Sequence, residues 1–169
     1  MSEAQHLAHS LERLFSNPAS GVFAPFITVT DGLTAMQAAS VPAPRFNSVW
    51  AVVNHVWFWE ESLLRLLRGQ TATPEELGAT TEHGWPPAGS VADEAGWQAA
   101  RSRALATNAE LAQYIRAQDD EAMDQPLAAW GTVRGRAVLS ILAHDSYHTC
   151  EIISLRHMQG WWVEGTSLT

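Results

Sequence analysis

The sequence predicts an all-α protein folded as an up-and-down four-helix bundle. Three long segments carry apolar residues at helical spacing, and a shorter amphipathic segment precedes them. There is little sign of strands, and long helices bury their apolar stripes most simply against one another. The chain has 169 residues, 46% of them hydrophobic, which fits one domain over residues 1–169 with a core of its own.

The N-terminal third is expected to hold one helix and a shorter helical segment. Leucines recur at helical spacing through residues 2–16, and Pro18 stops this pattern. The apolar segment 22–29 is interpreted as a short helix, although residues 27–30 also suit a strand. Residues 41–45 contain two prolines and predict an extended connector.

A second long helix is expected to begin at an N-cap on Asn47 or Ser48 and to end at Gly69. Its apolar stripe and its closing glycine make it the clearest helix of the chain. Residues 69–89 then form a loop-rich region, with prolines and glycines, that is long enough to line a pocket.

The last two long helices follow this loop. Ser90 and Asp93 resemble a capping box, which predicts a third helix over residues 91–118. Thr132 is a suitable N-cap for the final helix, predicted over residues 133–160.

Charge and composition exclude several classes of partner. The net charge is −8, lysine is absent and the ten arginines are scattered, so nucleic acid is not an expected partner. No apolar segment approaches the roughly 20 residues that span a bilayer, which excludes a membrane protein. The N-terminus lacks a signal sequence, and the single cysteine, Cys150, suits a reducing cytoplasm; we expect this cysteine to be buried as a small apolar residue.

Three histidines are the candidate metal ligands. His144 and His148 stand four residues apart in the final predicted helix, so both rings leave the same, otherwise apolar face. Burying two unpaired imidazoles there is unfavourable, and a shared metal ion removes that penalty. His55 lies in the second long helix, and three neutral imidazoles with an open position describe a reactive transition-metal site. The alternative for each ring is a hydrogen-bonded core histidine.

Two acidic residues accompany the histidine pair. Glu151 lies on the face of His144 and could be a ligand, a hydrogen-bond partner of a ligand, a general base, or a solvated residue. Asp145 stands where the H-E-x-x-H motif of metalloproteases has its glutamate, so that motif is absent. The shorter carboxylate could instead orient a ring or cap a neighbouring helix.

Two aromatic residues are candidates for the pocket wall. Trp59 follows His55 by one helical turn and could keep the site dry. Tyr147 could donate a hydrogen bond into the site or simply pack its ring. His83, in the loop, and His157, on another face of the last helix, are left out of the ligand set.

These residues resemble those of the DinB-like, or YfiT-like, four-helix-bundle metalloproteins. The resemblance rests on Asn47-Ser48-Val49-Trp50, Asn54-His55, Trp59-Glu60-Glu61, Gly96-Trp97-Gln98, Ala143-His144-Asp145-Ser146-Tyr147-His148, Glu151-Ile152 and Leu155-Arg156. It implies a divalent metal, nickel or zinc, bound by His55, His144 and His148 with waters completing the shell. It also implies a homodimer. The sequence departs from the common family pattern at residues 149–151, where Thr-Cys-Glu replaces a small-Gly-Gln run.

The function expected from this resemblance is a metal-dependent enzyme acting on a small molecule. Members with an assigned activity are thiol S-transferases that use bacillithiol, mycothiol or glutathione, and a maleylpyruvate isomerase. Thiol transfer is the first hypothesis, and a hydrolase with Glu151 as its base is the second. A non-catalytic stress-response protein stabilised by its metal is the third, and a helical dimerisation module whose histidines never meet is the fourth.

Overall fold

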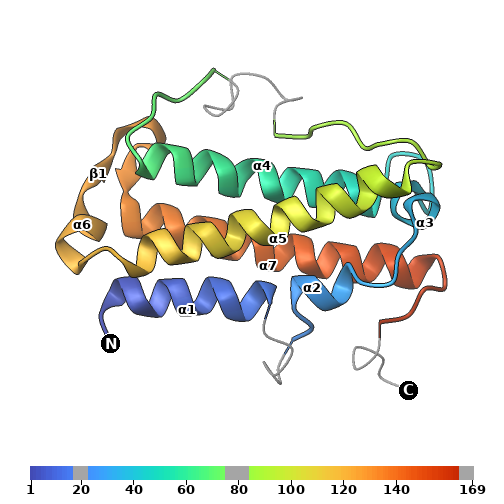
Figure 1. The fold of residues 1–169 in the computed structure, drawn as a ribbon, viewed down its shortest axis with the longest axis horizontal. Helices are drawn as coiled ribbons and strands as arrows, with labels where there is room; N and C mark the ends of the chain where they lie inside the picture. The colour runs from blue at the N-terminus through green and yellow to red at the C-terminus, as the bar shows by residue number, and fades with distance from the viewer. Residues whose placement is uncertain (17–22, 75–83, 164–169) are drawn as a thin grey trace.

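A computed structural model places four long helices side by side (Figure 1). It describes residues 1–16, 23–74 and 84–163. The long helices are α1 (Glu3–Phe15), α4 (Val49–Leu67), α5 (Glu94–Arg116) and α7 (Arg134–Met158). Three short helices join them, α2 (Phe26–Val29), α3 (Ala35–Ala39) and α6 (Asp120–Asp124). The predicted all-α bundle is confirmed.

The helices form a ring in which α1 and α4 each pack against both α5 and α7. Helices α4 and α5 are parallel, because residue numbers rise together along both: Asn54 bonds to Arg103, Glu60 to Asn108 and Leu67 to Tyr114. Helix α7 is antiparallel to α4, so the four helices run up, down, down and up (Figure 1). This order differs from the simple up-and-down alternation expected from the sequence. The long connection between α4 and α5 is the one that returns the chain to the other end of the bundle.

The caps explain where the central helices begin. Ser48 is the N-cap of α4, as predicted, and its hydroxyl accepts a hydrogen bond from the N–H of Ala51. Helix α5 begins three residues later than predicted. Its cap is the side chain of Asp93, which accepts the N–H of Gly96, whereas the Ser90 hydroxyl only accepts the N–H of Ala92 in the preceding turn.

The prediction that Thr132 caps the last helix is wrong. Thr132 belongs to the short strand β2 (Thr132–Val133), which pairs antiparallel with β1 (Pro126–Leu127) around the 3-10 turn η2 (Ala128–Trp130). Its backbone therefore belongs to a strand pair, and α7 starts after Val133 without a side-chain cap. A threonine before a helical pattern suits either role, and only the pairing with Leu127 decides between them.

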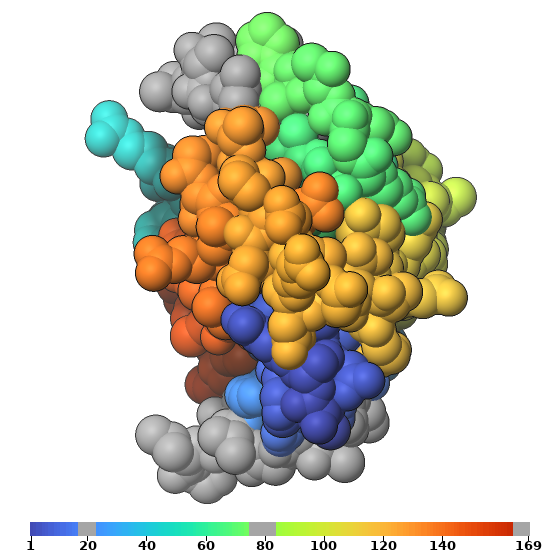
Figure 2. Space-filling model, turned by 90° about the vertical axis from the view of Figure 1, so that its left-hand side faces the viewer, coloured from blue at the N-terminus to red at the C-terminus, as the bar shows by residue number. Residues whose placement is uncertain are grey.

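The other short elements refine the expectations. Residues 26–29 are helical, which removes the strand alternative there, and residue 22 lies outside the described part. Residues 41–45 form a connector without regular structure, but it bends and turns where an extended segment was expected, with Arg45 at φ +73 and the N–H of Phe46 donating to the carbonyl oxygen of Ala43. Figure 2 shows the end of the bundle at which α1 begins. The segment from α6 to β2 covers this end. This segment buries Met123 and Leu127 and so closes the core at that end.

The core consists of two apolar clusters with polar residues between them. One cluster gathers around Val53 and Trp97, near the start of α4, and the other around Leu64 and Leu111, near its end. The residues between the clusters include a set of buried polar side chains, here named the polar layer: Asn54, His55, Glu60, Thr107, Asn108, Asp145, His148 and Thr149. Apolar residues at these positions would stabilise the bundle better, so the polar layer indicates a functional site.

In the part of the chain that the structure describes, every helix is too short or too polar to cross a bilayer.

Candidate metal centre

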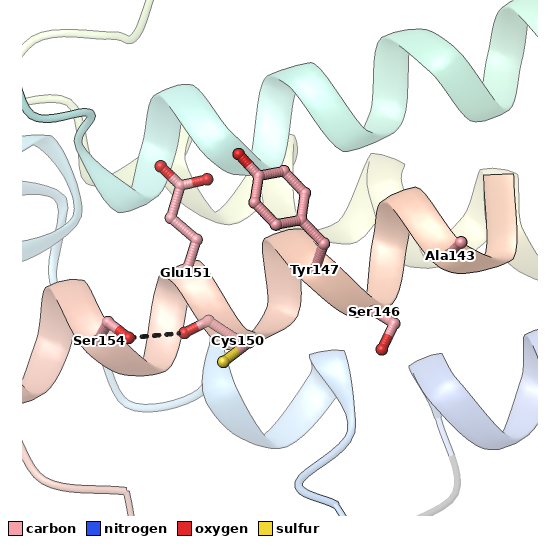
Figure 3. A pocket seen from close by; sticks show the side chains of 6 residues that line it. All are labelled: Ala143, Ser146, Tyr147, Cys150, Glu151 and Ser154. Carbon is pink, nitrogen blue, oxygen red and sulfur yellow. Dashed lines mark hydrogen bonds between the residues drawn. The ribbon is translucent and has the colours of Figure 1, made fainter. Parts of the chain in front are cut away.

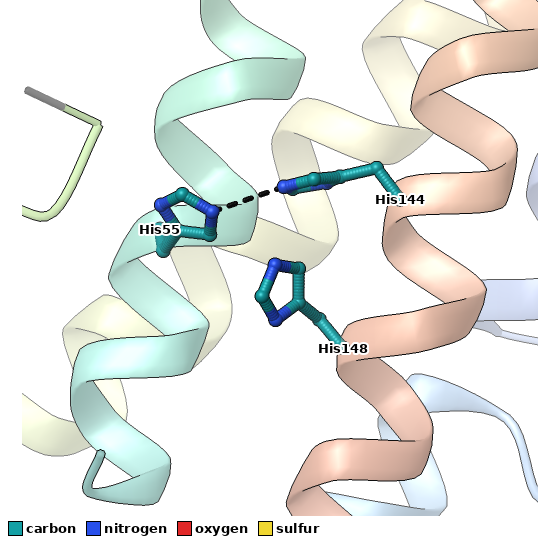
Figure 4. A group of neighbouring side chains, drawn as sticks. All are labelled: His55, His144 and His148. Atoms are coloured by element: carbon teal, nitrogen blue, oxygen red, sulfur yellow. Dashed lines mark hydrogen bonds between the residues drawn. The ribbon is translucent and has the colours of Figure 1, made fainter. Parts of the chain in front are cut away.

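The three predicted ligands come together in the polar layer. His55 projects from α4, and His144 and His148 project from consecutive turns of α7 toward it (Figure 4). One ring nitrogen from each residue lies within 4.8 Å of the other two. Only 7% of His55 and 2% of His148 is exposed, whereas His144 is half-buried. The cluster is therefore open toward solvent on the His144 side.

Each histidine ring is oriented by a hydrogen bond from its outer nitrogen. Nδ1 of His55 donates to the carbonyl oxygen of Gly84. Nδ1 of His144 donates to Oδ1 of Asp145 at 3.0 Å, and Nδ1 of His148 donates to Oε2 of Glu151 at 2.7 Å. Because the ring hydrogen sits on Nδ1 in all three cases, the Nε2 lone pair of each ring is free. Metal-binding histidines are usually held by this type of contact.

The contact between His55 and His144 is compatible with a cation between the two rings. Their Nε2 atoms lie 3.0 Å apart (Figure 4), and neither carries a hydrogen when both rings are neutral. Two lone pairs would then face each other, unless a proton or a metal ion lies between them. Burial lowers the pKa of His55 to about 4 and that of His144 to about 4, so protonation of either ring is unfavourable at neutral pH.

The donor set suits a divalent transition metal. Bond lengths of about 2.0–2.1 Å to imidazole nitrogen place two tetrahedral ligands roughly 3.3 Å apart, so small movements of these rings would accommodate the ion. The carboxylates of Asp145 and Glu151 lie directly behind two of the ligands and would offset a charge of +2. Three neutral imidazoles leave a fourth position for a substrate or a water, which is typical of catalytic metal sites.

The lowered pKa values predict that acid destabilises the metal-free protein. Between pH 6.5 and about 4 the unfolded chain binds protons that the folded rings of His55 and His144 do not. The free energy of unfolding should therefore fall as the pH falls through this window. Urea midpoints measured from pH 7.5 to 4.5 on chelator-treated protein test this, with His144→Asn as the control. Equal pH slopes in both proteins would contradict the prediction.

Glu151 is held by two hydrogen bonds. Its Oε2 accepts from His148, and its Oε1 accepts from the side-chain amide of Asn47 at 2.8 Å. The bond from His148 lowers the pKa of Glu151 most, and the bond from Asn47 lowers it further. Glu151 is thus a carboxylate fixed behind a candidate ligand. Among the roles left open by the sequence, this geometry favours a hydrogen-bond partner of His148.

Aromatic rings enclose the cluster. Trp85 stacks on His55 with a centroid distance of 3.8 Å, and Trp59 meets the same ring edge-on at 6.4 Å. The ring of Tyr147 lies 4.3 Å from that of His148, although 64% of Tyr147 is exposed. These rings surround the ligands with apolar surface, which strengthens electrostatic interactions inside.

Helix α7 also forms the floor of a shallow pocket beside the cluster (Figure 3). The pocket has a volume of about 620 Å³ and is lined by Ala143, Ser146, Tyr147, Cys150, Glu151 and Ser154. Glu151 and Tyr147 point from α7 toward α4. Cys150 is exposed in this pocket, so the expectation that it is buried is wrong. It lies two residues after His148, on the outer face of the helix, because a helix turns about 200° over two residues.

The excluded histidines stay outside the cluster as far as the structure describes them. His157 lies against Trp162 beyond the site, with 4.4 Å between ring centroids, and His83 falls outside the described residues.

Several residues with a part in the site were missed or given no role by sequence reasoning. Gly84 has φ +81, and a Cβ there would lie 2.7 Å from Nε1 of Trp59, so this position needs glycine to bring its carbonyl to His55. Trp85 and Asn47 contact the cluster or its partners. Glu60 was detectable, because it is an acidic residue within the apolar stripe of α4.

Comparisons with known proteins agree with this arrangement. A family model described as the DinB superfamily matches residues 24–152, a span that includes all three histidines. Searches among curated proteins and among solved structures gave no match.

Proposed function

Because the chain belongs to the DinB superfamily, we propose that it is a metal-dependent enzyme that transfers a low-molecular-weight thiol to an electrophilic small molecule. His55, His144 and His148 would hold the metal. One observation supports the metal site most directly. All three Nδ1 atoms donate hydrogen bonds to acceptors outside the cluster, while the Nε2 atoms converge. This arrangement has no purpose in a purely structural polar layer, where each Nε2 would also need a donor.

Zinc and nickel are the proposed metals, since both accept imidazole nitrogen readily. A divalent ion bound there would supply the positive charge that favours a thiolate or a hydroxide at neutral pH. The chain's own residues would do three things. The outer hydrogen bonds hold the imidazoles, Trp85 and Trp59 limit access of water, and the half-buried side near His144 leaves room for a substrate.

The state of Glu151 favours thiol transfer over hydrolysis. Hydrolysis needs a base with an oxygen free to take a proton from water. Both oxygens of Glu151 already accept hydrogen bonds, and its lowered pKa makes it a weak base. Thiol transfer depends less on a general base, because the pKa of a thiol, about 8.5, already lies near neutrality. Metal-dependent hydrolysis, with Glu151 released from His148, is the second candidate.

A non-catalytic stress-response protein is the alternative from another class. In that case the ion would mainly stabilise the bundle by compensating the polar layer. The two apolar clusters on either side of the layer argue against this role, because they give the bundle a core that does not depend on metal.

The experiment that tests the proposal begins with protein purified without an affinity tag. We expect elemental analysis to find about one divalent metal ion per chain. The metal-bound protein is then incubated with an electrophile such as a chlorodinitrobenzene and, in turn, with cysteine, glutathione, bacillithiol and mycothiol. Metal-dependent consumption of one thiol supports transfer. Bound metal without any thiol consumption, but with cleavage of ester or amide substrates, would favour hydrolysis.

We further propose a cytoplasmic homodimer. The resemblance to the family supports the dimer, and an exposed free cysteine at position 150 suits a reducing compartment. Sedimentation equilibrium should give twice the 18.5 kDa mass of one chain.

A further inference from the structure

The loop segment of residues 84–89 covers two of the candidate metal ligands. The carbonyl oxygen of Gly84 accepts the hydrogen bond from Nδ1 of His55. The next residue, Trp85, stacks on the ring of His55 and meets the ring of His148 edge-on, with 5.8 Å between the latter centroids. The orientation of His55 therefore depends on where this segment lies along α4.

Both ends of the segment lie against tryptophans of α4. Gly84 lies against Trp59, and Gly89 lies so close to Trp50 that a Cβ on this glycine would collide with the indole ring. Residue numbers fall along α4 as they rise along the segment, so the two run antiparallel. Apolar contacts of this kind are not directional. They hold the segment against the helix without fixing its position along the helix.

A hydrogen bond from Asn54 fixes that position. The side-chain amide of Asn54, which is only 4% exposed, donates to the carbonyl oxygen of Pro87 at 2.9 Å. An extended chain advances about 3.3 Å per residue. A shift of the segment by one residue would therefore break this bond, and it would carry the carbonyl of Gly84 out of hydrogen-bonding reach of His55.

The amide of Asn54 is itself held in one orientation. Its Oδ1 accepts a hydrogen bond from Nη2 of Arg103 on α5 at 3.3 Å. The guanidinium carbon of Arg103 lies 3.7 Å from the ring centroid of Trp57, a cation–π contact that holds the arginine in place. Because a guanidinium group only donates, Oδ1 must face Arg103 and the amide nitrogen must face Pro87.

Two prolines make the segment stiff. Pro86 and Pro87 have fixed φ angles, and a proline also restricts the residue before it to extended conformations, here Trp85. Trp85 and Pro86 alone separate Pro87 from Gly84. A side chain of α4 that fixes Pro87 therefore also fixes the Gly84 carbonyl, which contacts His55.

We propose that Asn54 is a positioning residue of the metal centre: its hydrogen bond to Pro87 holds the 84–89 segment where the Gly84 carbonyl orients His55. Asn54 acts on the neighbouring ring through the segment and supplies no ligand atom. The proposal rests on the proposed metal site, because the orientation of His55 matters for function only if His55 binds the ion. The hydrogen bonds themselves do not depend on a metal.

A purely structural role of Asn54 makes a different prediction. If the residue only stabilised the loop, its loss would lower the melting temperature and leave the ring of His55 unchanged. Leucine has a similar volume and would extend the apolar cluster around Val53 without the cost of burying an amide. Asn54→Leu therefore removes the hydrogen bond with little loss of packing.

The first measurement uses metal-free protein. At pH 7 the ring nitrogens of ¹⁵N-labelled histidine should report His55 with its hydrogen on Nδ1 in the wild type, because only a donor can face the Gly84 carbonyl. In Asn54→Leu the ring should show a mixture of tautomers, since its Nε2 can then donate toward His144. A His55→Asn sample identifies the signal of His55.

Zinc affinity, measured by competition with a chromophoric chelator, is the second readout. The affinity of Asn54→Leu should be about tenfold below that of the wild type. This is the lower end of the 10–100-fold loss that is usual for partners of metal ligands, because Asn54 acts one contact further away. Arg103→Met removes the bond that orients the amide and should shift both readouts in the same direction by a smaller amount. Arg103 is exposed, so this variant should fold.

Tyr114→Phe is the matched control. The hydroxyl of Tyr114 on α5 donates to the carbonyl oxygen of Leu67 on α4, so this variant also removes one hydrogen bond from a side chain to a backbone carbonyl. It should lower the melting temperature but leave the His55 tautomer and the zinc affinity unchanged. A loss of zinc affinity as large as that of Asn54→Leu would show general damage and would overturn the proposal.

The remaining outcomes are equally decisive. A single Nδ1 tautomer of His55 or wild-type zinc affinity in Asn54→Leu would overturn the proposal, and so would a wild-type His55 with its hydrogen on Nε2. If Asn54→Leu does not fold, a wild-type tautomer and affinity in Arg103→Met overturn it instead. If the wild type binds no zinc but the tautomer changes as expected, the proposed function is refuted, while the action of Asn54 on His55 is supported.

Discussion

Replacing His148 by alanine is expected to remove both the bound metal and the thiol transfer. The ring is 98% buried and is held by Glu151, and it is one of the three members of the metal-binding group found among the described residues. The two remaining imidazoles would leave at most a weak two-ligand site. The loss of affinity should exceed the roughly 10–100-fold cost of losing an outer hydrogen-bond partner. Metal content per chain and the initial rate of thiol consumption measure the effect.

His9→Ala is the control, because His9 is an exposed histidine on α1. It should keep the metal and the rate of the wild type, which shows that losing a histidine as such has no effect. Circular dichroism and melting of His148→Ala show whether the bundle is intact. A folded His148→Ala protein that keeps its metal and its rate would refute the three-histidine centre.

The ligand set could be predicted because helix geometry is local. His144 and His148 share a face at a spacing of four residues in any helix, and the apolar surroundings of His55 placed it inside the bundle. The structure brings these side chains together because α4 and α7 are antiparallel neighbours. Which helices are neighbours depends on the order in which the four helices are arranged around the bundle. The periodicity of the sequence does not predict that order.

The partners of the ligands could not be derived in the same way. Gly84 reaches His55 through a loop whose path depends on the fit of Gly84 against Trp59. Asn47 bonds to Glu151 only because the residues before α4 lie beside α7. The error at Thr132 has the same origin, since pairing between β1 and β2 is a contact between residues that local patterns do not connect.

Stripping the metal with a chelator is expected to abolish thiol transfer but to leave the bundle folded. The two apolar clusters remain, while the rings of His55 and His144 lose the cation between their Nε2 atoms. An ion present at about 1,000 times its dissociation constant contributes roughly 4.1 kcal/mol. For a chain of this size that corresponds to a melting temperature about 8–16 °C lower without metal. Calorimetry and rate measurements on the same samples test both parts.

Restoring the metal distinguishes the enzyme from a structural metalloprotein. Zinc or nickel added to the stripped protein should recover the rate and the melting temperature together, whereas His148→Ala should respond to neither chelator nor metal. If the stripped protein unfolds entirely and the reloaded protein consumes no thiol, the ion is needed for the core and the stress-protein alternative is favoured. If the stripped protein still transfers thiol at the full rate, the polar layer serves another purpose, and the convergence of the three Nε2 atoms does not explain the reaction.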